Sequence, residues 1–160
     1  NIFRKLTVFE NVQAALIAHR GQARNFWGRA ETLYRDEAWQ LLGSLGLADQ
    51  ADAIGDSLSH GNQKQLELGI ALALEPELLL LDEPTAGMSA AETRETIRLI
   101  EHVTRERGLT LLFTEHDMDV VFAISQRIAV LHQGRLIADG PPPAVRADPE
   151  VIRAYLGISH

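Results

Sequence analysis

Residues 78–87 have the sequence LLLLDEPTAG, which places four leucines directly before two adjacent carboxylates and a proline. A short apolar run between turn signals predicts a buried strand, so Asp82 and Glu83 should stand at the carboxyl end of that strand. Open α/β sheets bind their ligands at this edge. An Asp there suits a magnesium ion beside nucleotide phosphates, and the following Glu can hold a water molecule. The stretch therefore predicts one half of a nucleotide site.

The loop that would hold the phosphates is absent from these 160 residues. Its pattern is Gly-x-x-x-x-Gly-Lys-Ser/Thr. The two lysines, Lys5 and Lys64, follow an arginine and a glutamine, so the sequence contains no Gly-Lys pair. Half of the expected nucleotide site is present and half is missing.

Length and composition exclude several classes of protein. A chain of 160 residues is one domain or part of one, and 46% hydrophobic residues can supply a core. The net charge of -7 argues against a nucleic-acid-binding module. The absence of cysteine excludes disulfides and thiolate chemistry and is consistent with a cytosolic protein. The longest apolar stretches, Gly69–Leu74 and Leu78–Leu81, are far shorter than the ~20 residues that a membrane span needs.

The first half of the chain is predicted to be helical. Thr7 and Glu10 have the spacing of a capping box, which should open a helix. Residues 46–63 are polar and interrupted by glycines, so they should form mostly loop with one helical turn. We expect helices over about residues 8–20, 29–45 and 60–75.

The second half alternates strands and helices. Ser89 and Glu92 form another capping box and should start a helix that ends at Gly108. A hairpin should turn at Gln133 and Gly134. We expect strands at residues 78–82 and 109–116, helices at 89–107 and 117–125, and a final helix capped by Asp148 that ends at Gly157.

These patterns predict an α/β fold. Continuously apolar strands separated by helices indicate a parallel sheet that is buried on both faces and flanked by helices. The first 60 residues contain no convincing strand. We therefore expect a helical subdomain over residues 1–60, and a core over residues 61–160 that ends in a β-hairpin and a helix.

Three further segments extend the site. LSHGNQ, at residues 58–63, places Ser59 and Gly61 at a helix start, where free N–H groups and the helix dipole favour an anion. His116, in TEHD, should follow a strand at the same sheet edge as the two carboxylates. AGMS, at residues 86–89, links the carboxylates to the next capping box. The order and spacing resemble the second half of an ABC-type ATPase: signature motif, Walker B strand, D-loop and switch histidine.

Within that family the chain is similar to the cytoplasmic ATP-binding subunits of importers for branched-chain or other hydrophobic amino acids. The resemblance runs from about residue 7 to 157 and is carried by FRKLTVFENV, DEPTAGMSAAET and DPEVIRAYLG. Urea and amide importers are close neighbours. The resemblance implies a partial ABC-ATPase fold, ATP and Mg²⁺ as cofactors, and a cytoplasmic location at the inner face of the cell membrane. It also implies a head-to-tail dimer with a second ATP-binding subunit, transmembrane permease subunits as partners, and no nucleic acid.

The resemblance also implies roles for the residues that match its motifs. Asp82 would bind Mg²⁺ through water, Glu83 would polarise the attacking water, and His116 would contact the γ-phosphate and position that water. Three residues would touch the γ-phosphate of ATP held by the partner subunit: Ser59, Gly61 and Asn62. The D-loop would cross the dimer interface with Gly87, Met88 and Ser89.

The sequence departs from the family pattern at three positions. The usual signature is Leu-Ser-Gly-Gly-Gln, and His60 and Asn62 stand at its third and fifth places. The D-loop commonly ends in Asp, where this chain has Ser89. These differences bear on the rate of hydrolysis and leave the family resemblance intact.

Missing parts of the family's site determine what we expect of this chain alone. The phosphate loop, the aromatic residue that stacks on adenine and a glutamine that joins the lobes all precede the matched segment in the family. We therefore expect the C-terminal portion of a longer subunit, which neither binds ATP tightly nor hydrolyses it alone. Strands without their neighbours leave apolar edges, so we also expect the chain to self-associate.

Two other classes of function compete with a transport ATPase. Non-transport ABC ATPases of DNA repair and chromosome maintenance insert coiled coils or zinc modules before the signature, whereas only about 50 residues precede Leu58 here and none is cysteine. A non-catalytic docking module would bind a membrane partner through its helical lobe. Phe26, Trp27 and Trp39 should pack that lobe, with a surface for the partner's helix as the alternative for the first two. The histidines other than His116 are interpreted as structural or surface residues: His19, His60, His102, His132 and His160.

Overall fold

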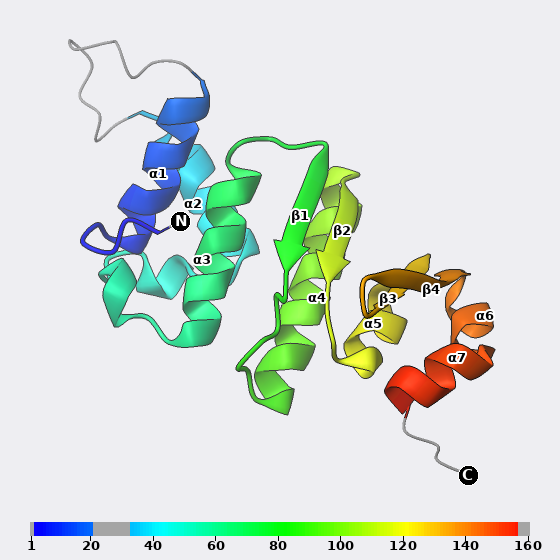
Figure 1. The fold of residues 1–160 in the computed structure, drawn as a ribbon. Helices are drawn as coiled ribbons and strands as arrows, with labels where there is room; N and C mark the ends of the chain where they lie inside the picture. Colours follow the sequence, from blue (N-terminus) through cyan, green and yellow to red (C-terminus); the bar gives the residue numbers. More distant parts are fainter. Residues whose placement is uncertain (1, 21–32, 157–160) are drawn as a thin grey trace. The chain divides into compact units, whose positions relative to one another are not determined.

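The computed structural model describes residues 2–20 and 33–156, which fall into two compact units. The first unit extends to Phe113 and the second begins at Thr114. Figure 1 shows the order of their helices and strands.

The first unit begins with a helical bundle. Helix α1 (Val8–His19) packs against α2 (Arg35–Ser44) and α3 (His60–Leu72) (Figure 1). The capping box predicted for α1 is confirmed: the Thr7 N–H donates to Glu10 Oε2 at 2.7 Å and the Glu10 N–H donates to Thr7 Oγ1 at 3.1 Å. Two N–H groups that the helix leaves without a partner are thus satisfied.

Apolar side chains from all three helices form the main core of this unit. A Cβ on Gly69 would lie 2.6 Å from Leu45 Cδ1, so any larger residue on α3 at this point would force the buried Leu45 side chain to move. The buried core residues of the unit include Val8, Val12, Leu16, Leu42, Leu45, Leu47, Leu66, Leu72, Leu79, Ile100 and Val103.

Two predicted helices differ from those in the structure. Helix α2 begins at Arg35, because Tyr34 has a left-handed backbone (φ 54°) that cannot continue a helix. Residues 29–32, where this helix was expected to start, lie outside the described residues. Helix α3 ends at Leu72 rather than at Glu75, which is also left-handed (φ 50°). The predicted loop between α2 and α3 holds two short 3₁₀ turns, Ala48–Gln50 and Gly55–Ser57, where one was expected.

Of the three aromatic residues predicted to pack the helical lobe, Trp39 lies within the described residues. Phe26 and Trp27 lie outside the described residues. Trp39 packs on Phe9, with ring centroids 5.3 Å apart, and is 37% exposed. This contact places Trp39 in the packing of the helical bundle, as predicted.

An ion-pair network joins the distal ends of the helices. Arg20 donates to Glu75 Oε1 at 2.9 Å and to Glu37 Oε1 at 3.3 Å, and its guanidinium stacks 4.8 Å from the centre of the Tyr34 ring. The hydrogen bond from Arg20, followed by its charge, lowers the pKa of Glu75 below the usual range. These groups are largely exposed, so the network adds little to the free energy of unfolding.

A strand–helix–strand unit follows the bundle. Strand β1 (Leu78–Asp82) pairs with β2 (Thr110–Thr114), and α4 (Ala90–Arg107) connects them. Figure 1 shows both arrows pointing the same way, so the sheet is parallel as predicted. The predicted capping box at Ser89 is confirmed, and Gly108 (φ 63°) ends α4 in the left-handed conformation that glycine favours.

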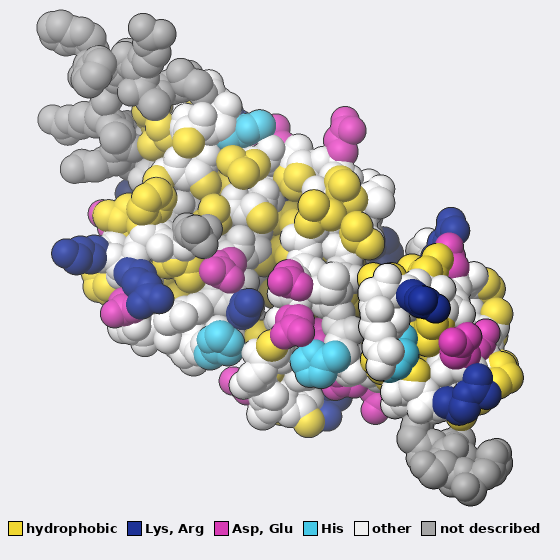
Figure 2. All heavy atoms as spheres, viewed as in Figure 1, with side chains coloured by type: hydrophobic (Ala, Val, Ile, Leu, Met, Phe, Trp, Pro, Cys, Tyr) yellow, Lys and Arg dark blue, Asp and Glu magenta, His cyan; other side chains and the backbone are white. Residues whose placement is uncertain are grey.

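The prediction that both strands are buried on both faces was wrong for this chain. Leu79 is 3% exposed on the covered face, whereas Leu78, Leu80 and Leu112 on the opposite face are 49%, 63% and 61% exposed. Figure 2 shows hydrophobic side chains gathered over β1 and β2. Strands that are apolar at every position need other residues packed on both faces of the sheet. The described residues pack on one face only. We call these three residues the open sheet face.

The second unit contains a helix, a hairpin and two short terminal helices. Helix α5 (Met118–Ile124) precedes β3 (Ile128–His132) and β4 (Arg135–Gly140), which pair antiparallel across the predicted turn. Helices α6 (Pro142–Ala147) and α7 (Pro149–Val151) follow, and the last turn of the described chain, Ile152–Leu156, is a π-helix. Helix α6 was not predicted.

Arg127 fixes the start of the hairpin to its end. It donates two hydrogen bonds to Asp139, at 2.8 and 2.9 Å. This bidentate pair lowers the pKa of Asp139, through the hydrogen bond first, and then through the charge of Arg127.

Across the described residues, none of the helices has the length and apolar character that crossing a membrane requires.

Candidate functional site

The two carboxylates lie where the sequence predicts them. Asp82 is the last residue of β1, Glu83 follows it, and both are exposed. Figure 2 shows acidic side chains at the surface where β1 ends. Glu83 has a left-handed backbone (φ 44°), and its carbonyl accepts a hydrogen bond from the N–H of Ala86 at 3.2 Å, which closes a turn. Holding a non-glycine residue in the left-handed backbone region costs on the order of 1–3 kcal/mol, and such residues cluster at active sites.

The carboxylates fit a magnesium ion of the kind that accompanies a nucleotide. Within residues 2–20 and 33–156, no three His, Cys, Asp or Glu side chains gather as a complete metal site. Mg²⁺ usually keeps several waters and takes one or two carboxylates beside substrate phosphates. An exposed Asp82 at a strand end matches that requirement, whereas a closed protein cage is not built here.

The signature segment opens α3. Ser59 is the N-cap, and its hydroxyl accepts the N–H of Asn62 at 3.2 Å. Gly61 is buried in the first turn. The Asn62 side chain donates to Gln50 Oε1 at 2.9 Å, a partner that the sequence analysis did not identify. Because Gln50 lies 12 residues upstream, at the end of the 3₁₀ turn Ala48–Gln50, no local pattern indicates this bond.

The D-loop segment, Gly87–Ser89, lies beside that helix start. Gly87 is left-handed (φ 77°), and Met88 is held by its N–H bond to the Thr85 carbonyl at 3.2 Å and by the Thr96 hydroxyl, 3.3 Å from Sδ. A Cβ on Gly87 would stand 3.6 Å from the His60 ring. The structure therefore brings the signature and D-loop segments of one chain together.

His116 lies in the second unit, after the end of β2 and before Asp117, the N-cap of α5. Its side chain is exposed, while that of the adjacent Glu115 is 1% exposed. Glu115 Oε2 accepts the His116 N–H at 3.3 Å and lies 3.9 Å from Nδ1. Glu115 thus lies beside His116 and binds its backbone, a neighbour that the sequence analysis did not single out although it stands in the same motif.

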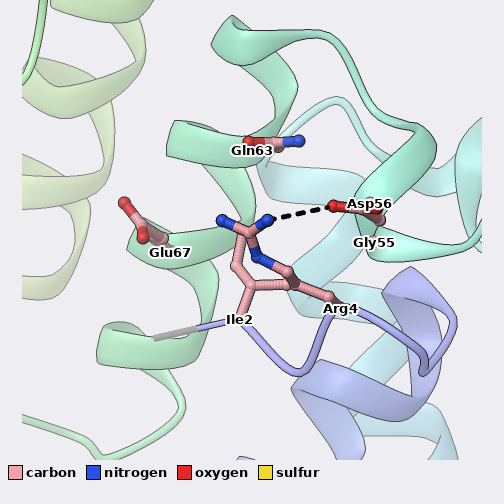
Figure 3. A pocket seen from close by; sticks show the side chains of 6 residues that line it. All are labelled: Ile2, Arg4, Gly55, Asp56, Gln63 and Glu67. Carbon is pink, nitrogen blue, oxygen red and sulfur yellow. Dashed lines mark hydrogen bonds and ion pairs between the residues drawn. The ribbon is translucent and has the colours of Figure 1, made fainter.

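A polar pocket of about 260 Å³ opens beside the first turns of α3 (Figure 3). Gln63 and Glu67 line one wall, and Arg4 contacts Asp56 across the mouth at 3.4 Å. The Arg4 and Asp56 side chains are 80% and 64% exposed, so this ion pair is a weak surface contact. None of the predicted site residues lines the pocket.

Comparison with known proteins identifies the family. The ABC transporter family model matches residues 1–86, which is more than half of the chain and includes the signature segment and both carboxylates. The chain belongs to the ABC transporter family. The model for the branched-chain amino acid ATP-binding cassette transporter matches residues 135–160 of this family member.

Relatives of known name agree with this family. The chain is 39% identical to the high-affinity branched-chain amino acid transport ATP-binding protein LivG of Escherichia coli K12, and 35% identical to BraF of Pseudomonas aeruginosa, over 98% of its own length and 64% of theirs. It is also 36% identical to the lipopolysaccharide export ATP-binding protein LptB of E. coli K12, over 98% of the chain and 62% of that protein. The chain thus spans less than two-thirds of the length of these ABC relatives.

Solved structures show the same fold. The ADP conformation of MJ1267, an ATP-binding cassette of an ABC transporter, superposes with a TM-score of 0.78 at 27% identity, over 96% of this chain and 64% of that one. The cbiO1 protein of Clostridium perfringens, part of an ABC transporter complex, gives 0.74 at 30% identity, over 93% and 56%. The predicted partial ABC-ATPase fold is confirmed.

Proposed function

We propose that this chain is part of the ATP-hydrolysing subunit of an importer for branched-chain amino acids. The observation that carries the substrate class is the match of residues 135–160 to the branched-chain family model. Overall identity alone does not separate importers from exporters, because the chain is 39% identical to LivG and 36% identical to the export protein LptB. We call the longer protein that would contain this sequence the intact subunit.

At the exposed end of β1, the two carboxylates would have different roles. Mg²⁺, when bound with ATP, neutralises charge on the phosphate oxygens. Asp82 would hold that ion through water. Glu83 would take the proton of the attacking water. His116, beside Glu115, would hold the water against the γ-phosphate.

The remaining site residues would act on the partner subunit. The start of α3, with Ser59, Gly61 and Asn62, would touch the γ-phosphate of the partner's ATP through N–H groups and the helix dipole. The D-loop, Gly87–Ser89, would cross the interface. A site divided between two chains makes hydrolysis depend on dimer closure, since phosphoryl transfer is mostly positioning and electrostatics.

The proposal extends to partners, location and organisation. The subunit would sit at the cytoplasmic face of the membrane, beneath transmembrane permease subunits. Residues 1–60 would form its helical subdomain and residues 61–160 part of its catalytic core. The 160-residue chain by itself would be inactive, because no Gly-Lys phosphate loop occurs in it.

Transport by the intact subunit tests the proposed function. Reconstituted with its permease in vesicles, it should drive ATP-dependent uptake of leucine or isoleucine and not of urea. Uptake of urea in place of the amino acids would move the assignment to the neighbouring importer class. DNA-stimulated hydrolysis without uptake would overturn the transport assignment.

The open sheet face predicts self-association of the 160-residue chain. Leu78, Leu80 and Leu112 expose an apolar patch next to strand edges, which favours pairing with a second copy. Sedimentation at about 100 μM should show dimers or larger species, because association would remove these leucines from water. Replacing Leu80 and Leu112 by lysine should shift the chain to monomer. Leu131→Lys is the matched control, since Leu131 is equally exposed (62%) on β3. A monodisperse monomer of the unaltered chain contradicts the prediction.

A further inference from the structure

His60 occupies the third signature place, and its ring lies against the D-loop of its own chain. A Cβ built on Gly87 would stand 3.6 Å from His60 Cδ2 and 3.7 Å from Nε2, which is ordinary van der Waals contact. The ring edge therefore lies next to the Gly87 backbone. The usual family residue at this place, glycine, has no side chain to make such a contact.

The same two segments lie close together at a second point. Gly61 follows His60, and a Cβ there would lie 3.7 Å from Oε1 of Glu92. Glu92 completes the capping box of α4 by accepting the Ser89 N–H at 2.8 Å. The hydrogen bonds from Ser89 lower the pKa of Glu92, and the charge of His60 adds to this effect. The starts of α3 and α4 thus meet at two neighbouring points.

The D-loop has few other attachments in the described chain. The hydrogen bonds of Met88 lead back to Thr85, in the preceding turn, and to Thr96 on α4. Neither bond reaches the signature segment. The His60 ring, beside Gly87, and Glu92, which binds Ser89 and lies beside Gly61, are therefore the side chains placed between the D-loop and the start of α3.

We propose that His60 is a positioning residue, which holds the D-loop against the signature helix so that the two segments facing the partner subunit move together. The inference rests on the proposed function for its consequence, since those segments matter only if the site is shared between subunits. The ring acts by packing, so an aromatic replacement should substitute for it.

The contact itself is tested in the 160-residue chain. We compare the amide resonances and amide exchange of residues 85–89 in the unaltered chain and in His60→Ala, His60→Phe and His102→Ala. His102 is an exposed histidine on α4 that pairs with Glu106, and it serves as the control. His60→Ala should shift these resonances and speed exchange of the Met88 amide about threefold or more, whereas amide exchange in the other two variants should stay near that of the unaltered chain. Superimposable D-loop spectra for His60→Ala overturn the proposal. Should His60→Ala lose its fold by circular dichroism, His60→Gly, which restores the usual family residue, takes its place.

The consequence is tested by hydrolysis in the intact subunit. His60→Ala should raise KM for ATP about three- to tenfold with little change in kcat, which corresponds to about 0.7–1.4 kcal/mol of lost binding. His60→Phe should restore KM, a rescue that loss of fold would not show. Equal KM values for unaltered protein and His60→Ala overturn the positioning role. An intact subunit without hydrolysis refutes the proposed function instead, and the D-loop spectra then still decide the contact.

Discussion

Replacing Glu83 by glutamine in the intact subunit is expected to lower ATP hydrolysis by about 10²–10⁴-fold, the usual contribution of a general base. Glutamine keeps the size of the side chain and its capacity to orient water, but it cannot accept the proton. ATP should therefore bind and remain unhydrolysed. Size-exclusion chromatography with light scattering should show a stable ATP-bound dimer, while phosphate release falls.

A glutamate at the opposite end of β1 supplies the control. Glu77 precedes β1 at its opposite end, is exposed, and contributes its backbone carbonyl to Thr110 at 3.0 Å. Glu77→Gln removes the same charge and leaves that backbone bond intact, so turnover should stay near the unaltered value. Unchanged turnover in Glu83→Gln would remove Glu83 from the mechanism. Equal losses in both variants would indicate a general charge effect in place of a base.

Features set by neighbouring residues could be predicted from the sequence. The capping boxes at Thr7 and Ser89 need only a partner three residues away, and both form as expected. The hairpin turn at Gln133 and Gly134 is equally local. Helix α6 could have been found in the same way, because Pro142 at its first turn is a position where proline starts helices.

Features that depend on tertiary contacts could not be predicted. The left-handed backbones of Tyr34 and Glu83 carry no glycine signal. The contacts of His60 with Gly87 and of Asn62 with Gln50 join segments that only the fold brings together. The predicted burial of both sheet faces was wrong for a different reason. An apolar strand pattern indicates that both faces need to be packed, but it does not indicate which residues pack on them.

Replacing Asn11 should destabilise the 160-residue chain more than any surface substitution. Asn11 is fully buried on α1, and its Oδ1 accepts the Phe3 N–H at 2.7 Å. Its amide lies within hydrogen-bonding distance of three carbonyl oxygens, those of Phe3, Leu6 and Thr7, at 3.1, 3.4 and 2.8 Å. One side chain therefore satisfies the backbone of the segment that leads into α1. Asn11→Ala should lower the free energy of unfolding by about 2–4 kcal/mol, because several buried polar groups lose their partner.

Asn11→Asp separates shape from hydrogen bonding. The carboxylate keeps the acceptor for Phe3 but turns lone pairs toward three carbonyl oxygens, so burial should raise its pKa in the folded state. A carboxyl with a raised folded pKa is destabilising above that pKa, and the loss is recovered as pH falls and the proton becomes a donor. Urea unfolding should thus show Asn11→Asp at least as unstable as Asn11→Ala at pH 7 and closer to the unaltered chain near pH 4. Gln40→Glu makes the same chemical change at an exposed site on α2 and should stay within about 0.5 kcal/mol at both values. If Asn11→Asp were as stable as the unaltered chain at pH 7, the amide would not be the donor that orders the entry to α1.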